Sequence, residues 1–396
     1  MVKKIDLFMP PRSQYGVLHH FTLKLAEALV RQGVDTEVLE AEWNNPKPFL
    51  EKIFTRKPDC TLSFNGLLPD DEGRFFCDLI GIPHVAYLVD SQNQFFPLVQ
   101  SPNTIVVTTD QYSRDFFRGI KCRNVIFVPH GVERELSPDL EANRTYDVTI
   151  LTSLVDYEDI RTRWKERFPK VIRDAIDEAI EETLLGDDVW YVQALVNSLD
   201  RQMELKGAID PSKIDFISIL DDMEMYIKGK SRVDLIKSIK DAKVHLFGSP
   251  GDAKSWSDYL GGNLPNIQVH EPVPYVQALD IFKQSKIILN ASPWIRNGSH
   301  ERVLSSMASE ALVITDSNEF LRNNFQSGKD LILYPYKDFE TVNDLVNEYL
   351  SNHKKREEIV HKGRDSVMRA HTWDHRAKTL IRELDPILES MQKKTP

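Results

Sequence analysis

The chain has 396 residues, with 50 lysines and arginines and 60 aspartates and glutamates, so its formal net charge is −10. Apolar residues make up 41% and charged residues 28%, which is ordinary globular usage and argues against a mostly disordered chain. The acid excess argues against a protein that binds nucleic acid broadly, and no apolar run approaches the roughly 18 residues of a membrane helix.

The cysteines and the N-terminal residues bear on the compartment. Cys60, Cys77 and Cys122 are an odd number and lack metal-type spacing, which argues against a disulfide-stapled secreted protein. The first apolar stretch is too short and too interrupted by Pro10 and Pro11 for a signal peptide. We therefore expect a cytoplasmic protein without an integral membrane segment.

Short apolar strands alternate with helices from the start of the chain. Strands are expected at residues 4–9, 35–39, 60–65, 84–89, 104–109 and 124–128. The first helix carries Leu18, Phe21, Leu25 and Leu29 on one face and ends at Gly33. This alternation predicts a parallel sheet that is covered by helices on both faces.

The alternation resumes after a polar stretch at residues 129–145, where we place a domain linker. Further strands are expected at residues 147–151, 243–247, 266–270, 286–290, 312–315 and 331–334. Six strands and six strands predict an α/β protein of two doubly wound, Rossmann-like units.

Residues 158–239 interrupt the second unit with amphipathic helices and no confident strand. We interpret them as a helical insertion after the first strand of that unit. The insertion serves either as a structural buttress or as a platform that binds an acceptor or a second subunit.

Ligands of open parallel sheets bind beyond the carboxyl ends of the strands, so polar residues there are candidates. Asp90 ends an apolar strand; it is a candidate general base if it is shielded from water, and otherwise a cap. Gly248 follows another strand and lets a backbone or a ligand approach closely. Asn65 and Gly66 favour an ordinary turn.

Residues 286–302 carry the strongest pattern, a strand that runs through a polar loop into a helix. Ser299 is expected to cap this helix, whose free N–H groups would hold a diphosphate. Arg296, His300 and Arg302 are candidates for contacts with that diphosphate. Glu301 either sits in the first turn because of the helix dipole or accepts hydrogen bonds from ribose hydroxyls.

The run from Lys286 to Asp316 resembles the C-terminal signature of GT-B glycosyltransferases. It is most similar to the CgeB-like, spore-maturation-type branch and related bacterial protein and surface-glycan glycosyltransferases. The matching positions are Lys286, Asn290, Gly298, His300, Glu301, Arg302, Met307, Ala308, Thr315 and Asp316.

The resemblance implies a GT-B fold, with two Rossmann-like domains facing across a cleft. It implies a metal-independent hexosyl- or related transferase with no bound cofactor, which moves a sugar from a UDP- or GDP-linked donor to a protein or glycan acceptor. The first domain would bind the acceptor and supply Asp90. The second would bind the nucleotide sugar through Gly248, Asn290, Arg296, Gly298, Ser299, His300, Glu301 and Arg302.

Three positions depart from the pattern of the family. Many retaining members carry two glutamates where this chain has Asn297 and Ser305, and a glycine where it has Glu310. Inversion or retention therefore stays open, as does the oligomeric state. Two other functions remain: a sugar-nucleotide epimerase of the same architecture, and a catalytically degenerate partner subunit.

The domain limits follow from the polar linker and the insertion, and the resemblance adds a last helix that crosses back to the first domain; the alternative is a last helix that packs only on the second domain. We expect an N-terminal domain at 1–138, a C-terminal domain at 139–371 with the insertion inside it, and a last helix at 372–396 that crosses back to the first domain. The two crossings, at residues 129–145 and 372–373, would form a hinge.

Overall fold

The computed structural model describes residues 2–42, 44–139, 144–207, 210, 214–251, 254–262 and 264–393. Residues 140–143 of the expected linker and the last three residues of the expected final helix lie outside this description. The chain forms two compact units: Met1–Leu136 with Pro274–Val276 and Met368–Pro396, and Ser137–Val273 with Gln277–Val367.

The first unit contains a doubly wound sheet. In the part of the chain that the structure describes, its six parallel strands lie in the order β2-β1-β3-β4-β5-β6. They are β1 (Lys4–Phe8), β2 (Asp35–Leu39), β3 (Cys60–Phe64), β4 (His84–Leu88), β5 (Thr104–Thr108) and β6 (Val125–Phe127). The helices between them are α1 (Val17–Arg31), α2 (Lys47–Arg56), α3 (Phe76–Ile80) and α4 (Gln111–Gly119). The predicted strands are therefore confirmed.

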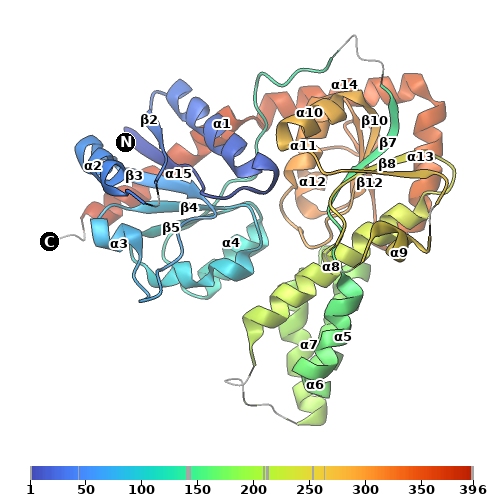
Figure 1. The fold of residues 1–396 in the computed structure, drawn as a ribbon, viewed down its shortest axis with the longest axis horizontal. Coiled ribbons are helices and arrows are strands. Elements are labelled where there is room, and N and C mark those ends of the chain that lie inside the picture. Colours follow the sequence, from blue (N-terminus) through green and yellow to red (C-terminus); the bar gives the residue numbers. More distant parts are fainter. Residues whose placement is uncertain are drawn as a thin grey trace. The chain divides into compact units, whose positions relative to one another are not determined.

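The C-terminal helix α15 (Trp373–Gln392) belongs to the first unit and packs against α1, as Figure 1 shows. Arg31 of α1 donates two hydrogen bonds to the Asp374 carboxylate, at 2.7 and 2.8 Å. The Trp373 ring is fully buried, with its centroid 5.3 Å from that of Phe21 and 6.0 Å from that of Phe64. The Arg31–Asp374 ion pair thus fixes the start of α15 where Trp373 packs on the aromatic side chains of the core.

The short segment Pro274–Val276, with Tyr275 at its centre, belongs to the first unit although the chain on both sides of it belongs to the second, where we expected it. The Tyr275 ring lies 5.1 Å from the ring of His20 and 5.6 Å from that of Phe21. This aromatic contact accounts for the assignment of Pro274–Val276.

The second unit repeats the architecture. Among the residues described, six parallel strands lie in the order β12-β11-β10-β7-β8-β9. They are β7 (Tyr146–Leu151), β8 (Val244–Phe247), β9 (Ile267–His270), β10 (Ser285–Asn290), β11 (Leu312–Asp316) and β12 (Ile332–Tyr334). The helices outside the insertion are α9 (Trp256–Leu260), α10 (Tyr275–Gln284), α11 (Glu301–Ala308), α12 (Glu319–Asn324), α13 (Val342–Ser351) and α14 (His353–Ala370).

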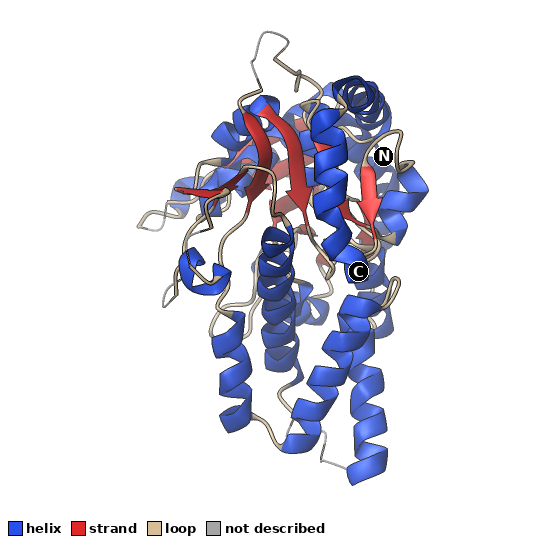
Figure 2. Cartoon of the chain, turned by 90° about the vertical axis from the view of Figure 1, so that its right-hand side faces the viewer, coloured by secondary structure: helices blue, strands red, loops and turns tan. Residues whose placement is uncertain are grey.

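The expected helical insertion lies between β7 and β8. It comprises α5 (Tyr157–Arg167), α6 (Lys170–Leu185), α7 (Tyr191–Lys206) and α8 (Phe216–Ser238). Figure 2 shows these helices extending from one end of the second sheet. Within the unit, α8 also lines the core, because Val233 and Ile236 are buried with Val244 and Ile287 of the sheet.

No helix in the described ranges is long and apolar enough to cross a membrane.

Replacing Trp373 by Ala should lower the free energy of unfolding of the first unit by about 3–5 kcal/mol, because it empties a fully buried aromatic site. Thermal and urea unfolding would measure the loss. Lys378→Ala, at an exposed position of the same helix, is the control and should have little effect. Equal stability of the two variants would contradict the packing of α15.

The free energy of unfolding of the first unit should decrease as the pH is lowered, because of His84. This histidine is buried and its ring nitrogens contact the Thr61 and Ser63 hydroxyls. Burial lowers the pKa of His84 from 6.5 to about 3. The unfolded chain therefore binds the proton first, and stability is lost as pH falls from 6.5 toward 3, by about 1.4 kcal/mol per pH unit.

His84→Gln should reduce this pH slope by about one proton, as measured by urea unfolding between pH 7 and 4. His353→Gln, at an exposed histidine of α14, is the control and should keep the full slope. An unchanged slope in His84→Gln would show that the buried imidazole does not control the acid response.

Candidate functional site

The carboxyl end of β10 carries a buried polar network centred on Asn290. The Asn290 amide donates to the hydroxyls of Ser292, at 3.1 Å, and Thr315, at 3.0 Å. Its carbonyl oxygen accepts a hydrogen bond from the Arg302 guanidinium at 3.1 Å. The predicted residues Asn290 and Arg302 are thus brought together, and Asn290 fixes the position of the cation.

Helix α11 begins next to this network, and its N-cap is His300 rather than Ser299. The expected cap is wrong because the Ser299 hydroxyl donates to the carbonyl of His300, at 3.1 Å. The ring Nδ1 of His300 lies 3.4 Å from the backbone N of Arg302 and 2.5 Å from the Glu301 carboxylate. The first turn of α11 therefore presents an imidazole, a carboxylate and a guanidinium together.

Two further cations reach this loop from α8 of the insertion. The Lys228 ammonium lies 5.3 Å and the Arg232 guanidinium 5.6 Å from the ring centroid of Trp294, in the loop between β10 and α11. Arg232 also donates to the carbonyl of Ser153, at 3.0 Å, just after β7. Lys228 pairs with Glu224 at 2.5 Å, so its charge is balanced within the helix. Cation–π contacts at such distances are attractive and hold both side chains near the indole.

Burial and like charges shape the electrostatics of this cluster. Burial is the main cause that lowers the pKa of Arg232 to about 9; the charge of Arg302 lowers it further, and Glu301 opposes the shift. Burial also lowers the pKa of His300, an effect that Glu301 opposes and Arg302 reinforces. We name the group of Arg232, His300, Glu301 and Arg302 the cationic cluster. An anion bound between the two guanidiniums would relieve their repulsion.

Arg296 and Gly248, both predicted to bind nucleotide sugar, have structural contacts. The Arg296 guanidinium is buried and donates to the backbone carbonyls of Thr183 and, at 3.1 Å, Val189, which tie the loop to the insertion. A Cβ on Gly248 would lie 1.7 Å from the carbonyl oxygen of Thr152. The close approach of the two backbones is sufficient to require glycine at this position.

The remaining residues of the predicted site lie within the same loop. The carbonyl of Gly298 accepts a hydrogen bond from the Asn318 side chain at 3.1 Å, which shapes the turn before α11. Asn297 and Ser305, two of the positions that depart from the signature described above, are buried. Glu310 has φ = +59°, the left-handed conformation that favours glycine after a helix, so the backbone here would also suit the glycine of the signature described above.

Asp90 lies in the first unit, beyond the carboxyl end of β4. Its carboxylate accepts a hydrogen bond from the Asn65 amide at 2.6 Å, and the Asn65 carbonyl accepts from the backbone N–H groups of Val89 and Asp90. Asp90 is exposed, so the expected shielding from water is wrong. The turn expected at Asn65 and Gly66 is confirmed, with left-handed φ values of +62° and +66°, and the Asn65 side chain also holds the segment at Asp90 in place.

Sequence reasoning missed Arg232 and Lys228. Both lie in the insertion, far in sequence from the loop that they contact. Their spacing of four residues on one helix face was the available signal, because such residues are neighbours on a helix. It could not reveal which loop the face would meet.

No cluster of three or more histidines, cysteines, aspartates or glutamates that could hold a metal is present among the described residues.

Comparison with known proteins places this geometry in context. A family model described as "Glycosyl transferase-like" matches residues 232–382, a range that begins at Arg232 and includes the whole cationic cluster. A search of curated proteins gives no significant match.

Solved structures resemble the whole chain at low identity. Sucrose-phosphate synthase from Thermosynechococcus elongatus has a TM-score of 0.56 at 11% identity, over 98% of this chain and 100% of that one. A glycosyltransferase from Rickettsia africae has a TM-score of 0.54 at 11% sequence identity, and the match covers 100% of both chains. Anabaena Alr3699/HepE in complex with UDP-glucose has a TM-score of 0.53 at 10% sequence identity, and the match covers 98% of this chain and 100% of that one. These likenesses show that the chain has the GT-B fold of glycosyltransferases.

Gly248→Ala should destabilise the second unit by more than about 2 kcal/mol, because the added methyl group meets a backbone oxygen. Gly119→Ala is the control, since open space surrounds that glycine. Thermal unfolding would compare them. If Gly248→Ala melted like the parent protein and lost only nucleotide binding, Gly248 would be a ligand residue after all.

Proposed function

We propose that this protein is a glycosyltransferase that moves a sugar from a nucleoside-diphosphate sugar to a protein or surface-glycan acceptor. We also propose the CgeB-like, spore-maturation-type branch as its nearest group. The match of the glycosyl transferase-like model to residues 232–382 and the GT-B fold support the proposal.

The observation that carries the proposal is the cationic cluster at the N-terminus of α11. Two guanidiniums, Arg232 and Arg302, interact electrostatically near the N-terminal end of a helix, where the first backbone N–H groups point along the axis out of the helix. Diphosphates are bound by such combinations of arginine side chains and a helix N-terminus. In the proposed reaction, these groups would stabilise the negative charge that develops on the leaving nucleoside diphosphate, without a metal.

The other residues of the loop would orient the donor. Glu301 in the first turn of α11 has a carboxylate that can accept hydrogen bonds from ribose hydroxyls. His300, with its lowered pKa, would be mainly neutral at pH 7 and could accept or donate a hydrogen bond. Asn290 would act through Arg302, whose guanidinium it holds. The nucleotide would be UDP or GDP.

Asp90 stays our candidate for the base that accepts a proton from the acceptor hydroxyl. Its hydrogen bond from Asn65 leaves one carboxylate orientation favoured, which suits a group that must meet a hydroxyl. The proposed location is the cytoplasm. It is supported by the three cysteines, which are all buried and unbridged.

Alanine at Arg232 or at Arg302 should weaken UDP or GDP binding by roughly tenfold to a hundredfold, because hydrogen bonds to charged groups contribute about 1.5–3 kcal/mol. Titration calorimetry would measure the affinity. Arg163→Ala removes an exposed arginine from α5, which pairs with Asp159, and serves as the matched control. Equal affinities in all three variants, or no binding of either nucleotide by the parent protein, would contradict the proposal.

Incubation with a panel of UDP- and GDP-sugars separates the remaining functions. A glycosyltransferase should hydrolyse its own donor slowly in the absence of acceptor, and Arg302→Ala should abolish the release. Conversion of a donor into its epimer would identify an epimerase instead. Nucleotide binding without release or conversion of any sugar would favour the degenerate partner subunit.

A further inference from the structure

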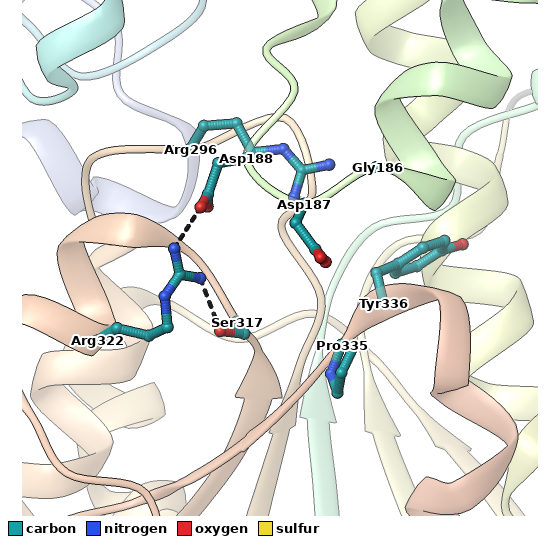
Figure 3. A pocket seen from close by; sticks show the side chains of 8 residues that line it. All are labelled: Gly186, Asp187, Asp188, Arg296, Ser317, Arg322, Pro335 and Tyr336. Atoms are coloured by element: carbon teal, nitrogen blue, oxygen red, sulfur yellow. Dashed lines mark hydrogen bonds and ion pairs between the residues drawn. The ribbon is translucent and has the colours of Figure 1, made fainter.

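The second unit contains a cavity that the proposed function does not use. It has a volume of about 380 Å³ and lies beyond the carboxyl ends of β11 and β12. The turn between α6 and α7 forms one wall, and Arg296, Ser317, Arg322 and Tyr336 line the others (Figure 3). The residues of the cationic cluster do not line it. Ligands of parallel α/β sheets bind at this edge, so its position is that of a binding site.

The walls of the cavity are held in place by contacts behind the lining. Arg296 donates to the carbonyls at the two ends of the α6–α7 turn. Arg322 pairs with Asp188 of the turn and donates to the Ser317 hydroxyl at 3.0 Å. The Tyr336 hydroxyl donates to Asp234 of α8 at 3.1 Å. Side chains from four separate segments are thus fixed, so a ligand would meet a largely preformed surface.

One carboxylate of the lining, that of Asp188, is only partly hydrogen-bonded. Asp188 has φ = +58°, a conformation that non-glycine residues rarely adopt. One of its carboxylate oxygens pairs with Arg322, whereas the other is buried and has no hydrogen-bond partner among the described residues. A buried carboxylate oxygen needs a donor, and strained residues of this kind gather at ligand sites. Because Asp188 also lines the cavity, an occupant that carries hydrogen-bond donors would meet an acceptor there.

The charges of the lining select a neutral occupant. The lining holds two carboxylates, Asp187 and Asp188, and two guanidiniums, Arg296 and Arg322, so an ion of either sign would meet like charge. Asp187 also pairs with Lys337 at 3.8 Å, just outside the lining. Hydroxyl groups match this lining, because each both donates to a carboxylate and accepts from a guanidinium. Pro335 and Tyr336 add an apolar edge that suits the C–H face of a sugar ring. The volume is near the lower end of the ~300–1,000 Å³ typical of small-molecule sites.

We propose that this cavity is a second carbohydrate site, which binds a neutral sugar residue separately from the nucleotide-sugar donor. Its hydroxyls would donate to Asp188 and accept from the arginines of the lining. The helical insertion would then have a binding role in addition to its structural one, because its α6–α7 turn supplies both carboxylates.

The test uses the full-length protein and ligand-observed saturation-transfer NMR. The probes are glucose, galactose, N-acetylglucosamine and rhamnose at millimolar concentrations, with and without saturating UDP. At least one sugar should bind saturably, UDP should leave the signal in place, and Arg302→Ala should not change it. No saturable binding of any probe would overturn the proposal, and so would displacement by UDP or loss in Arg302→Ala.

Two variants locate the binding. Asp188→Asn should weaken sugar binding by about tenfold, because it removes the charged acceptor, while asparagine still tolerates the left-handed backbone. Glu181→Gln removes one charge from an exposed position of α6 and is the matched control, with binding unchanged. Parent-like binding in Asp188→Asn would place the sugar elsewhere and contradict the proposal.

If Asp188→Asn lowers the melting temperature, Ser317→Phe provides the second variant, because it fills the cavity from the end of β11 without removing a charge. It should abolish sugar binding, and retained binding would likewise overturn the proposal. UDP affinity, measured on the same samples by calorimetry, reports separately on the donor site. Failure of one proposal is thereby distinguished from failure of the other.

Discussion

The candidate donor site depends on two positive charges that the fold holds near each other against their repulsion. Arg302 is fixed by the side chain of Asn290, and Arg232 by the carbonyl of Ser153 and the ring of Trp294. Burial is the main cause that lowers the pKa of Arg232 to about 9, the charge of Arg302 lowers it further, and Glu301 opposes these two effects only in part. A protein gains no stability from such an arrangement, because like charges in a partly buried place raise its free energy. The arrangement is understandable if a multiply charged anion completes it.

Helix α8 links this cluster to the core of the second unit. One of its faces carries Val233 and Ile236 into the hydrophobic core, while Lys228 and Arg232 meet Trp294 in the loop after β10. Gly229 lies between them, where a Cβ would come 2.9 Å from Tyr157. The burial of the apolar face therefore fixes the height and rotation of the helix, and with them the position of both cations. A shift of α8 by one residue along its axis would move Lys228 and Arg232 away from Trp294.

The architecture could be predicted from the sequence because it depends on local patterns. Most strands are short apolar runs whose burial on both faces leaves little choice of residue, whereas the edge strands β2 and β9 are more exposed. Each strand lies within a residue or two of its expected limits. The loop from Asn290 to Arg302 was also identifiable, because its polar residues follow a strand and precede a helix. What failed were properties set by tertiary contacts. Serine is a good helix cap in general, but the Ser299 hydroxyl donates to the carbonyl of His300 instead. Arg296 has a charge suited to phosphate, but its guanidinium donates to backbone carbonyls of the insertion. Arg232 lies 70 residues from Arg302 in the sequence, so no local pattern could show that the two would interact.

The most direct measurement is a crystal structure of the protein soaked with UDP or GDP. The account predicts that the diphosphate lies at the N-terminus of α11, with phosphate oxygens within hydrogen-bond distance of both the Arg232 and the Arg302 guanidiniums. A nucleotide bound elsewhere in the second unit, with both guanidiniums still in their present contacts, would contradict the account.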